Sequence, residues 1–138
     1  MEKAALKEHR RHSTADKPFS YYISNISEYF PNVPLHWHKE FELNVILEGK
    51  GDFVTGDKHF TAYKGDIVLT PPDMLHAVYQ HDDKRCVYDT LDLDGSMLGS
   101  RDNDRAADAF IAPLISGAYS IETHITPEHC YYSELLTT

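Results

Sequence analysis

The stretch Leu35-His36-Trp37-His38-Lys39-Glu40-Phe41-Glu42 decides how the rest of this chain is interpreted. Side chains alternate between the two faces of an extended strand, so a single strand here would place every even-numbered side chain on one face. That face would carry two histidines and two glutamates. Two imidazoles with one carboxylate are most of a ligand set for a divalent transition metal, so the stretch predicts a site built on this face.

The segment that follows, residues 41–47, alternates between apolar and other side chains and predicts a strand. Its odd-numbered side chains are all apolar, which ordinarily marks the face toward a core. Because the even-numbered face continues the line of histidines, we expect that face to line a cavity, with Asn44 and Ile46 deeper inside. The odd-numbered face then needs a cover, since an exposed apolar stripe promotes aggregation. We expect the C-terminal tail and a second copy of the chain, in a homodimer, to provide it.

Short strands separated by turns are predicted from residue 18 to residue 93. The turns are rich in glycine and polar residues and fall at 48–51, 56–58, 64–66 and 81–84. No helical pattern lies between the strands, so the predicted fold class is all-β, an antiparallel sandwich or barrel. The expected strands are 18–23, 41–47, 52–55, 59–63, 67–70, 76–80 and 85–93.

The two ends of the chain differ from this pattern, which divides it into an arm (1–17), a β-barrel (18–100) and a helical and strand tail (101–138). The arm is polar and without periodicity, and we expect it to be flexible. Prolines at 31 and 34 are expected to prevent a regular strand ladder before His36. The tail predicts a short helix at 104–115, a strand at 119–125 and a helix from Glu128 through Leu136. That last helix lacks a C-cap, which indicates that the chain continues into a longer protein.

Composition limits the classes of function. The chain has 138 residues, 41% of them apolar, with nine tyrosines and six phenylalanines, which is typical of one globular domain. A net charge of −9 would repel phosphate backbones, so we do not expect this chain to bind nucleic acid itself. The chain has no long apolar stretch, no secretory signal and only two cysteines, Cys86 and Cys130, from which we expect a cytoplasmic protein without a membrane partner.

Two runs of residues resemble the two motifs of the cupin superfamily. The first is His36-x-His38, three residues, Glu42, six residues, Gly49; the second is Gly65, five residues, Pro71, then Asp73 and His76. The resemblance implies a double-stranded β-helix, a jelly-roll-like barrel. It implies that metal ligands are His36, His38, Glu42 and His76, a donor set suited to zinc, nickel, iron or manganese.

Several positions depart from the cupin pattern. Phe30 and Asp73 stand where the family has glycines, and Gln80 stands where it has an asparagine. Aspartate tolerates the left-handed backbone conformation better than most residues, so we expect the turn at Asp73 to survive.

A narrower resemblance covers residues 30–95. Three runs of residues are similar to the N-terminal sensory domain of AraC-type transcriptional regulators. They are Pro34-Leu-His-Trp-His-Lys-Glu-Phe-Glu-Leu, Lys64-Gly-Asp-Ile-Val-Leu-Thr-Pro-Pro and Leu75-His76-Ala77. It implies a small-molecule effector, with a sugar as the expected class, bound inside the barrel of a homodimer. It also implies that the tail begins a dimerisation helix and that DNA is bound by a C-terminal domain absent from these residues.

The four implied ligands either hold a divalent metal or line a polar effector pocket without one. The ligand-binding set we expect is His36, His38, Glu42, Asn44, His76, Phe53 and Tyr88. Tyr79 is a further candidate for the cavity, Trp37 is expected to have a packing role, and Asp92 is interpreted as part of a solvated loop. The alternative function is a small metal-dependent cupin enzyme, a dioxygenase or a sugar isomerase.

Overall fold

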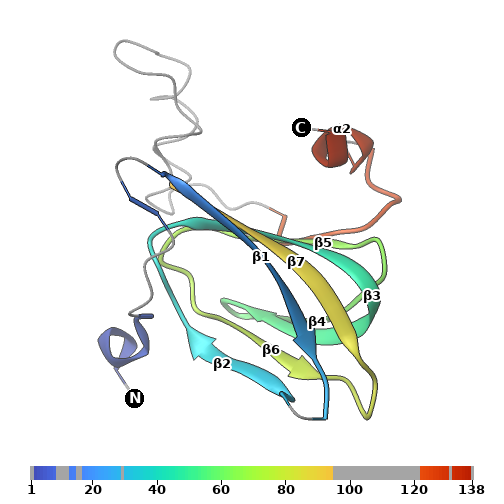
Figure 1. The fold of residues 1–138 in the computed structure, drawn as a ribbon, viewed down its shortest axis with the longest axis horizontal. Coiled ribbons are helices and arrows are strands. Elements are labelled where there is room, and N and C mark those ends of the chain that lie inside the picture. Colours follow the sequence, from blue (N-terminus) through green and yellow to red (C-terminus); the bar gives the residue numbers. More distant parts are fainter. Residues whose placement is uncertain are drawn as a thin grey trace.

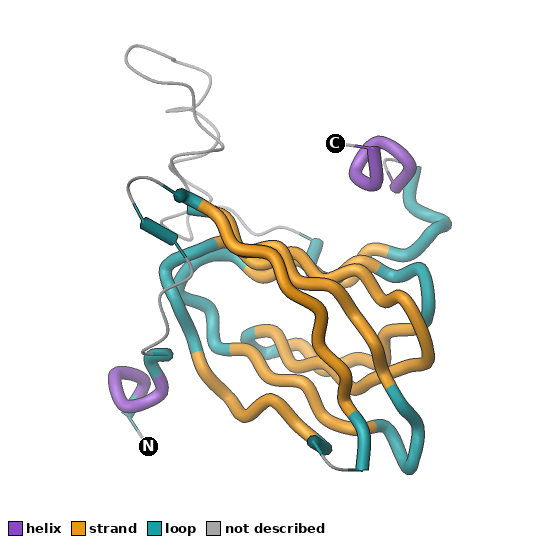
Figure 2. The backbone as a smooth tube through the Cα atoms, viewed as in Figure 1, coloured by secondary structure: helices purple, strands orange, loops and turns teal. Residues whose placement is uncertain are grey.

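The computed structural model describes residues 2–8, 13–14, 17–28, 30–94, 122–130 and 132–137, and its described part is almost entirely β-structure (Figures 1 and 2). This confirms the all-β fold class. The predicted helix at 104–115 lies outside the described residues. The elements are a 3-10 helix Lys3–Leu6 (η1), strands β1 Phe19–Ile26, β2 Asn32–His36, β3 Phe41–Thr55, β4 Lys58–Tyr63, β5 Ile67–Thr70, β6 His76–Gln80, β7 Cys86–Leu93 and β8 His124–Ile125, and helix α2 Tyr132–Thr137.

The strands form two layers that share one long strand (Figure 1). In one layer the order is β1-β7-β3-β5-β8, and in the other β2 pairs with β6, which pairs with the second half of β3, which pairs with β4. All of these pairings are antiparallel. The first half of β3 therefore belongs to one layer and its second half to the other.

The predicted turn at 48–51 is wrong, because β3 runs through it as one fifteen-residue strand. A bulge between Ile46 and Glu48 adds a residue opposite β7, and Gly49 follows with a φ of 77°. Bulges bend a strand and increase its twist. The bulge also changes the face that is buried: Glu42 and Ile46 point inward before it, and Phe53 points inward after it.

Two further boundaries differ from the sequence-based expectation. Pro34 lies inside β2, which tolerates it because β2 is an edge strand whose register with β6 shifts between Val33 and His36. The last helix begins at Tyr132 and not at Glu128, because the chain first makes a turn in which the His129 amide donates to the Thr126 carbonyl.

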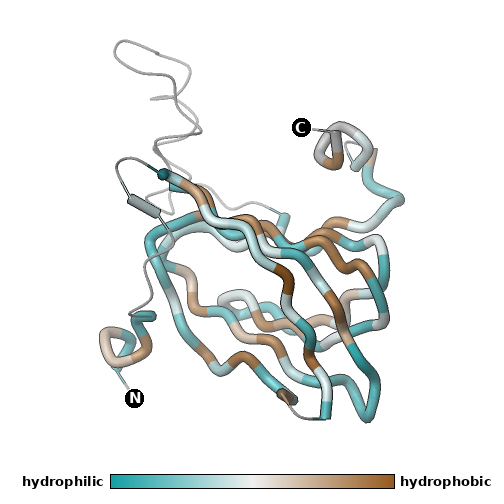
Figure 3. The backbone as a smooth tube through the Cα atoms, viewed as in Figure 1, coloured by the Kyte–Doolittle hydropathy of each residue, from teal (hydrophilic) through white to brown (hydrophobic). Residues whose placement is uncertain are grey.

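The interior between the layers is divided into an apolar end and a polar end. The apolar end is a packed cluster around Phe53, Tyr88 and Ile46, in which the Phe53 and Tyr88 rings meet edge to face with centroids 5.6 Å apart. Hydrophobic stretches alternate with hydrophilic turns along both layers (Figure 3). Cross-strand neighbours on one face of a sheet pack against each other, so the register extends this cluster across both layers. Its members are Ile26, Ile46, Phe53, Ala62, Val68, Val78, Cys86 and Tyr88.

Part of the N-terminal arm lies against the barrel at Trp37. The indole Nε1 donates to the Lys3 carbonyl at 2.7 Å, and the Trp37 amide donates to the Leu6 carbonyl at 3.1 Å. The ammonium groups of Lys3 and Lys7 lie 5.2 Å and 5.5 Å from the indole centroid, within the range of cation–π attraction. The packing role predicted for Trp37 is thus the one the structure gives it.

None of the helices among the described residues is long and apolar enough to cross a membrane.

The bend in β3 generates a stability prediction. A Cβ built on Gly49 would lie 1.8 Å from the Arg85 carbonyl oxygen, a backbone atom that cannot move away cheaply. We expect Gly49→Ala to lower the free energy of unfolding by about 3 kcal/mol or more, through this clash and the positive φ. The measurement is urea denaturation followed by tryptophan fluorescence.

Gly56→Ala is the matched control. Gly56 also has a positive φ, 62°, but the nearest atom to its added Cβ is the flexible Met74 side chain at 3.3 Å. We expect a loss of about 1 kcal/mol, the ordinary penalty of the left-handed region. Equal losses for the two variants would contradict the argument that Gly49 is needed for close approach of β7.

Candidate functional site

The four side chains implied as metal ligands meet at the polar end of the barrel. Their ligand atoms all lie within 4.8 Å of one another, and three of the four residues are buried. They come from the end of β2, the connection 37–40, the start of β3 and the start of β6. The cluster comprises His36, His38, Glu42 and His76.

The expectation that residues 35–42 form one strand is wrong. β2 ends at His36 and β3 begins at Phe41, because β2 pairs in one layer and the start of β3 in the other, so the chain must cross between them. A hydrogen bond stabilises this crossing: the His38 carbonyl accepts it from the Asp73 amide at 2.9 Å. Asp73 has a φ of 65°, the left-handed conformation expected for it in place of glycine.

Backbone carbonyl groups fix the tautomers of all three imidazoles. Each Nδ1 hydrogen-bonds a carbonyl oxygen two positions away in the chain, at 2.8 Å for His36, 3.1 Å for His38 and 2.9 Å for His76. A carbonyl oxygen only accepts, so each Nδ1 carries the proton and donates it. Each Nε2 is therefore left to face the interior of the cluster. Metal-binding histidines are oriented in this same way by the backbone.

The Glu42 carboxylate is the centre on which these nitrogens converge. His38 Nε2 lies 3.2 Å from Glu42 Oε1, and His76 Nε2 lies 3.6 Å from Glu42 Oε2. Burial opposes ionisation of Glu42, but the hydrogen bond from His38 and the charges of the two imidazoles outweigh it and hold the pKa of Glu42 well below its usual value. Neutral imidazoles would direct lone pairs at this carboxylate, so a cation, either protons or a metal ion, is needed at the centre.

His36 closes the cluster on the side of the arm. Its Nε2 lies 3.8 Å from the Glu8 carboxylate, next to the segment held by Trp37. Burial, followed by repulsion from His76, lowers the pKa of His36, although the Pro34 carbonyl and nearby carboxylates act against this shift. His36 is thus held in the neutral form that a metal requires.

The donor set and its geometry fit a divalent transition metal. Three neutral imidazoles and one carboxylate suit zinc, nickel, iron or manganese and leave positions open. Ligands bonded at about 2.1 Å to one ion lie at most about 4.2 Å apart, so the observed span needs only a small contraction. His76 Nε2 is buried and has no hydrogen-bond partner among the described residues, which a metal ion would correct.

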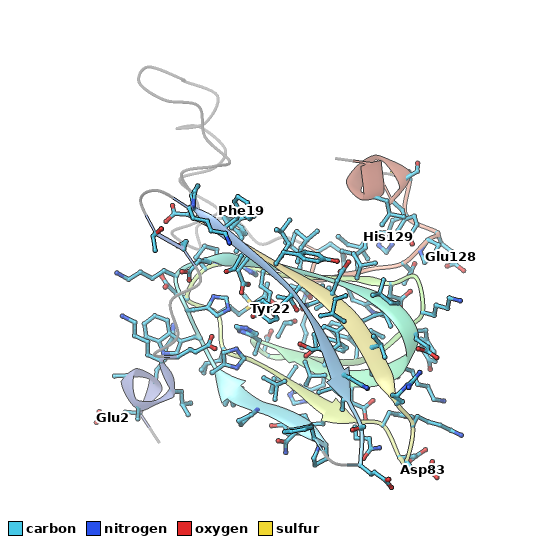
Figure 4. All side chains as sticks on the ribbon, in the orientation of Figure 1. Glu2, Phe19, Tyr22, Asp83, Glu128 and His129 are labelled. Carbon is cyan, nitrogen blue, oxygen red and sulfur yellow. The ribbon has the colours of Figure 1, made fainter. Side chains whose placement is uncertain are left out.

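The structure adds residues to the site that the sequence did not reveal. Asp92 was expected in a solvated loop, but it lies in β7, opposite Glu42, with no exposed surface. Its Oδ1 lies 3.8 Å from His38 Nε2, and its Oδ2 accepts from the Tyr22 hydroxyl at 3.0 Å. Tyr22, labelled in Figure 4, reaches Asp92 from β1. Burial, then the charges of Asp92 and Glu42, raise the pKa of Tyr22, so its hydroxyl keeps its proton. The alternation of 86, 88, 90 and 92 along β7 was the signal that could have placed Asp92 inside.

Glu40, the second glutamate of the 35–42 stretch, is also buried. Its side chain lies near His38, with Oε2 3.6 Å from Nδ1, and it accepts a hydrogen bond from the Ser13 hydroxyl at 2.9 Å. Ser13 belongs to the expected arm, so the arm contacts the site a second time. The cluster therefore lies beneath two contacts from the N-terminal segment.

The remaining predicted site residues lie inside the barrel at different depths. Asn44 is buried one step from Glu42 on β3, and its amide donates to the Thr90 hydroxyl at 2.9 Å. Phe53 and Tyr88 belong to the packed apolar end, below the cluster. Tyr79 does not face the interior: it pairs with Asp52 on the outer face and is 40% exposed.

A cavity of about 660 Å³ lies on the outer face and not at the cluster. Its lining includes Val54, His59, Thr61 and Tyr79, which share the outward face of the layer formed by β6, β3 and β4. Asp52 at its edge is already engaged, since its Oδ1 accepts from the Thr61 hydroxyl at 2.7 Å and pairs with His81 at 2.8 Å. None of the four cluster residues lines this cavity.

Comparison with solved structures establishes the fold. A cupin protein from Bacteroides fragilis superposes with a TM-score of 0.54 over 62% of this chain and 73% of its own, at 19% identity. A Cupin 2 conserved barrel domain protein from Salinispora arenicola superposes with a TM-score of 0.51 over 65% of this chain and 75% of its own, at 22% identity. The barrel is a cupin fold, as the resemblance implied.

Sequence comparison identifies the family. An uncharacterized HTH-type transcriptional regulator of Bacillus subtilis, YdeC, is 28% identical over 89 residues, which are 64% of this chain but only 31% of that regulator. The chain thus corresponds to about a third of the length of this relative. The sequence pattern of the AraC-like ligand-binding domain matches residues 20–101, which include both halves of the histidine cluster. The chain belongs to the AraC-like ligand-binding domain family.

Proposed function

We propose that this domain senses a small molecule, a sugar or a related polyol, at the polar end of its barrel, with a divalent metal held there. The observation that carries the proposal is the convergence of three oriented imidazole Nε2 atoms on the buried Glu42, beneath the N-terminal arm. Among the described residues of the barrel interior, the apolar end is already packed, so a polar ligand inside the barrel would find its partners at the polar end.

In this proposal His36, His38, Glu42 and His76 hold the metal. The ion would supply a Lewis-acidic centre for ligand oxygen atoms. The protein's own contribution is orientation: carbonyl groups hold the imidazoles, and Glu42 remains ionised at neutral pH because its pKa is lowered. Because these side chains are already oriented, metal binding needs only a small contraction of the cluster, which favours tight binding.

Metal binding gives the first functional prediction. We expect one equivalent of Zn²⁺ or Ni²⁺ to bind and to raise the melting temperature. At 100 times the dissociation constant the stabilisation is about 2.7 kcal/mol. Glu42→Gln and His76→Ala should each weaken binding by roughly 100-fold or more, since losing a ligand exceeds the loss of a supporting residue. Titration calorimetry of the untagged domain measures the stoichiometry and the affinities of the domain and its two variants, and thermal unfolding with and without the ion measures the melting temperature.

His81→Ala is the matched control for metal binding. His81 is also a histidine beside a carboxylate, 2.8 Å from Asp52, but it lies on the outer surface of the barrel. We expect its removal to leave the stoichiometry and affinity unchanged. A domain that binds no divalent metal, or one whose affinity falls equally in this variant, would contradict the proposed metal site.

Effector binding is expected to change the arm. Glu8 lies 3.8 Å from His36, and Trp37 holds the segment around it, so a ligand at the cluster competes with or strengthens these contacts. A ligand shifts such an equilibrium only by its difference in affinity for the two states. We expect hydrogen exchange of the amides of residues 5–8 to change by at least fivefold on binding of an effector found by calorimetry. An unchanged arm in the saturated domain would rule out this route.

At the level of the whole protein, we propose a cytoplasmic homodimeric regulator whose DNA is bound by another domain. The support is the family and the HTH-type relative, which this chain matches over part of its length. The expected result for the full-length gene product is sequence-specific DNA binding whose affinity changes 5- to 150-fold with effector, the usual range of allosteric coupling. Gel-shift titration with and without effector measures this coupling, and affinity independent of every bound ligand would contradict it.

A metal-dependent enzyme is the second candidate, and one observation favours it. Asp92 and Tyr22 place a carboxylate and a protonated hydroxyl beside His38, which supplies the proton-handling groups such an enzyme needs. Turnover of a sugar or oxygen-dependent substrate by the metal-loaded domain, abolished in Asp92→Asn, would favour this function over sensing alone.

A further inference from the structure

Two threonine hydroxyls at the polar end are buried without a hydrogen-bond partner. Thr55 and Thr70 are each at most 2% exposed, and the Oγ1 of each has no partner among the described residues. Buried hydroxyls are paired in the great majority of cases, and an unpaired one destabilises the fold. Two such groups in one small region therefore indicate a partner that binds there.

Both hydroxyls adjoin the histidine cluster, and they come from opposite layers. Thr55 ends β3 and is the direct cross-strand neighbour of His76, while Thr70 ends β5 and is the neighbour of Glu42. Directly opposed residues of an antiparallel pair share a face, with Cβ atoms about 5 Å apart. Because His76 and Glu42 lie 3.6 Å apart across the interior, the two threonines flank the cluster.

The charges around these hydroxyls have one sign. The buried polar residues among those described include Glu40, Glu42 and Asp92 but no lysine or arginine. A divalent cation at the cluster would offset two of these three negative charges. With that ion bound, an anionic ligand would still meet one uncompensated carboxylate charge in a region of low dielectric constant.

We propose that Thr55 and Thr70 form a subsite that binds hydroxyl groups of a neutral, polyhydroxylated ligand and discriminates against its carboxylate analogue. This inference rests on the proposed sensing function and deepens it by naming the residues and the charge class. Threonine hydroxyls donate and accept, so each can pair with a ligand hydroxyl in either direction.

The first test uses isosteric variants in the absence of ligand. Thr55→Val and Thr70→Val remove a hydroxyl at nearly constant volume. Because these hydroxyls are unpaired, we expect the urea midpoint to stay the same or rise. Thr90→Val is the opposite control, since it deprives the Asn44 amide of its acceptor and should lower the midpoint. A clear fall in midpoint for Thr55→Val and Thr70→Val, matching that of Thr90→Val, would overturn the claim that their hydroxyls await a ligand.

The second test measures binding with matched pairs of probes. D-galactose and D-glucose are titrated against D-galacturonate and D-glucuronate, which differ only in a carboxylate, with myo-inositol as a further neutral polyol. We expect a neutral probe to bind at least tenfold more tightly than its uronate. Each Thr→Val variant should weaken the neutral probe roughly tenfold, the effect of one lost hydrogen bond.

Thr123→Val provides a control for these binding measurements. The Thr123 hydroxyl is also buried and unpaired, but the residue precedes β8 and adjoins Leu69, away from the cluster. Its variant should leave probe binding unchanged. Preferential binding of uronates, or equal weakening by Thr123→Val, would overturn the subsite while leaving a sensing function intact. A domain that responds to no small molecule at all would overturn both.

Discussion

The crossing of β3 from one layer to the other is the constraint on which this barrel depends. One bulge after Ile46 and one left-handed glycine at position 49 turn a single strand through both layers. The bulge exchanges the buried face, so that Glu42 near the start of the strand and Phe53 near its end both point inward. A strand without the extra residue would place one of these two side chains in solvent.

This exchange explains why the interior has two chemical ends. Before the bulge, β3 contributes Glu42 and Asn44 to a polar region, and after it Phe53 anchors the apolar cluster. The apolar end supplies the burial that stabilises the fold, and the polar end can hold groups that would be costly without it. A ligand-binding region can thus lie inside a domain of this size without weakening its core.

Sequence patterns predicted most of the strands and the cluster, for reasons that are local. Strands β5 and β6 have the predicted bounds, because apolar residues and turn signals delimit them. The resemblance of two short runs to the cupin motifs implied the four residues that the structure brings together. The predictions that were wrong depend on pairing between residues far apart in the sequence. The glycines at 49 and 51 resemble a hairpin turn locally, and only pairing with β7 and β6 shows that the strand continues.

The errors around the site have a similar origin. Asp92 appears solvated among other aspartates in the sequence, although the register of β7 against β3 buries it. His36 and Glu42 were assigned to one strand because alternation cannot reveal a crossing between layers. The unpaired hydroxyls of Thr55 and Thr70 have no sequence signal at all, since pairing is a property of the folded neighbourhood.

The adjacency of His36 and Trp37 has a thermodynamic consequence. One residue faces the cluster and the next holds the arm, so site and arm are joined by a single peptide bond. If occupancy of the cluster changes the free energy of arm docking, then docking must change the free energy of occupancy by the same amount. Under the proposed coupling, the arm's sequence would help to set the affinity of the barrel, and mutation of the lysines against Trp37 would change that affinity without altering the cluster residues.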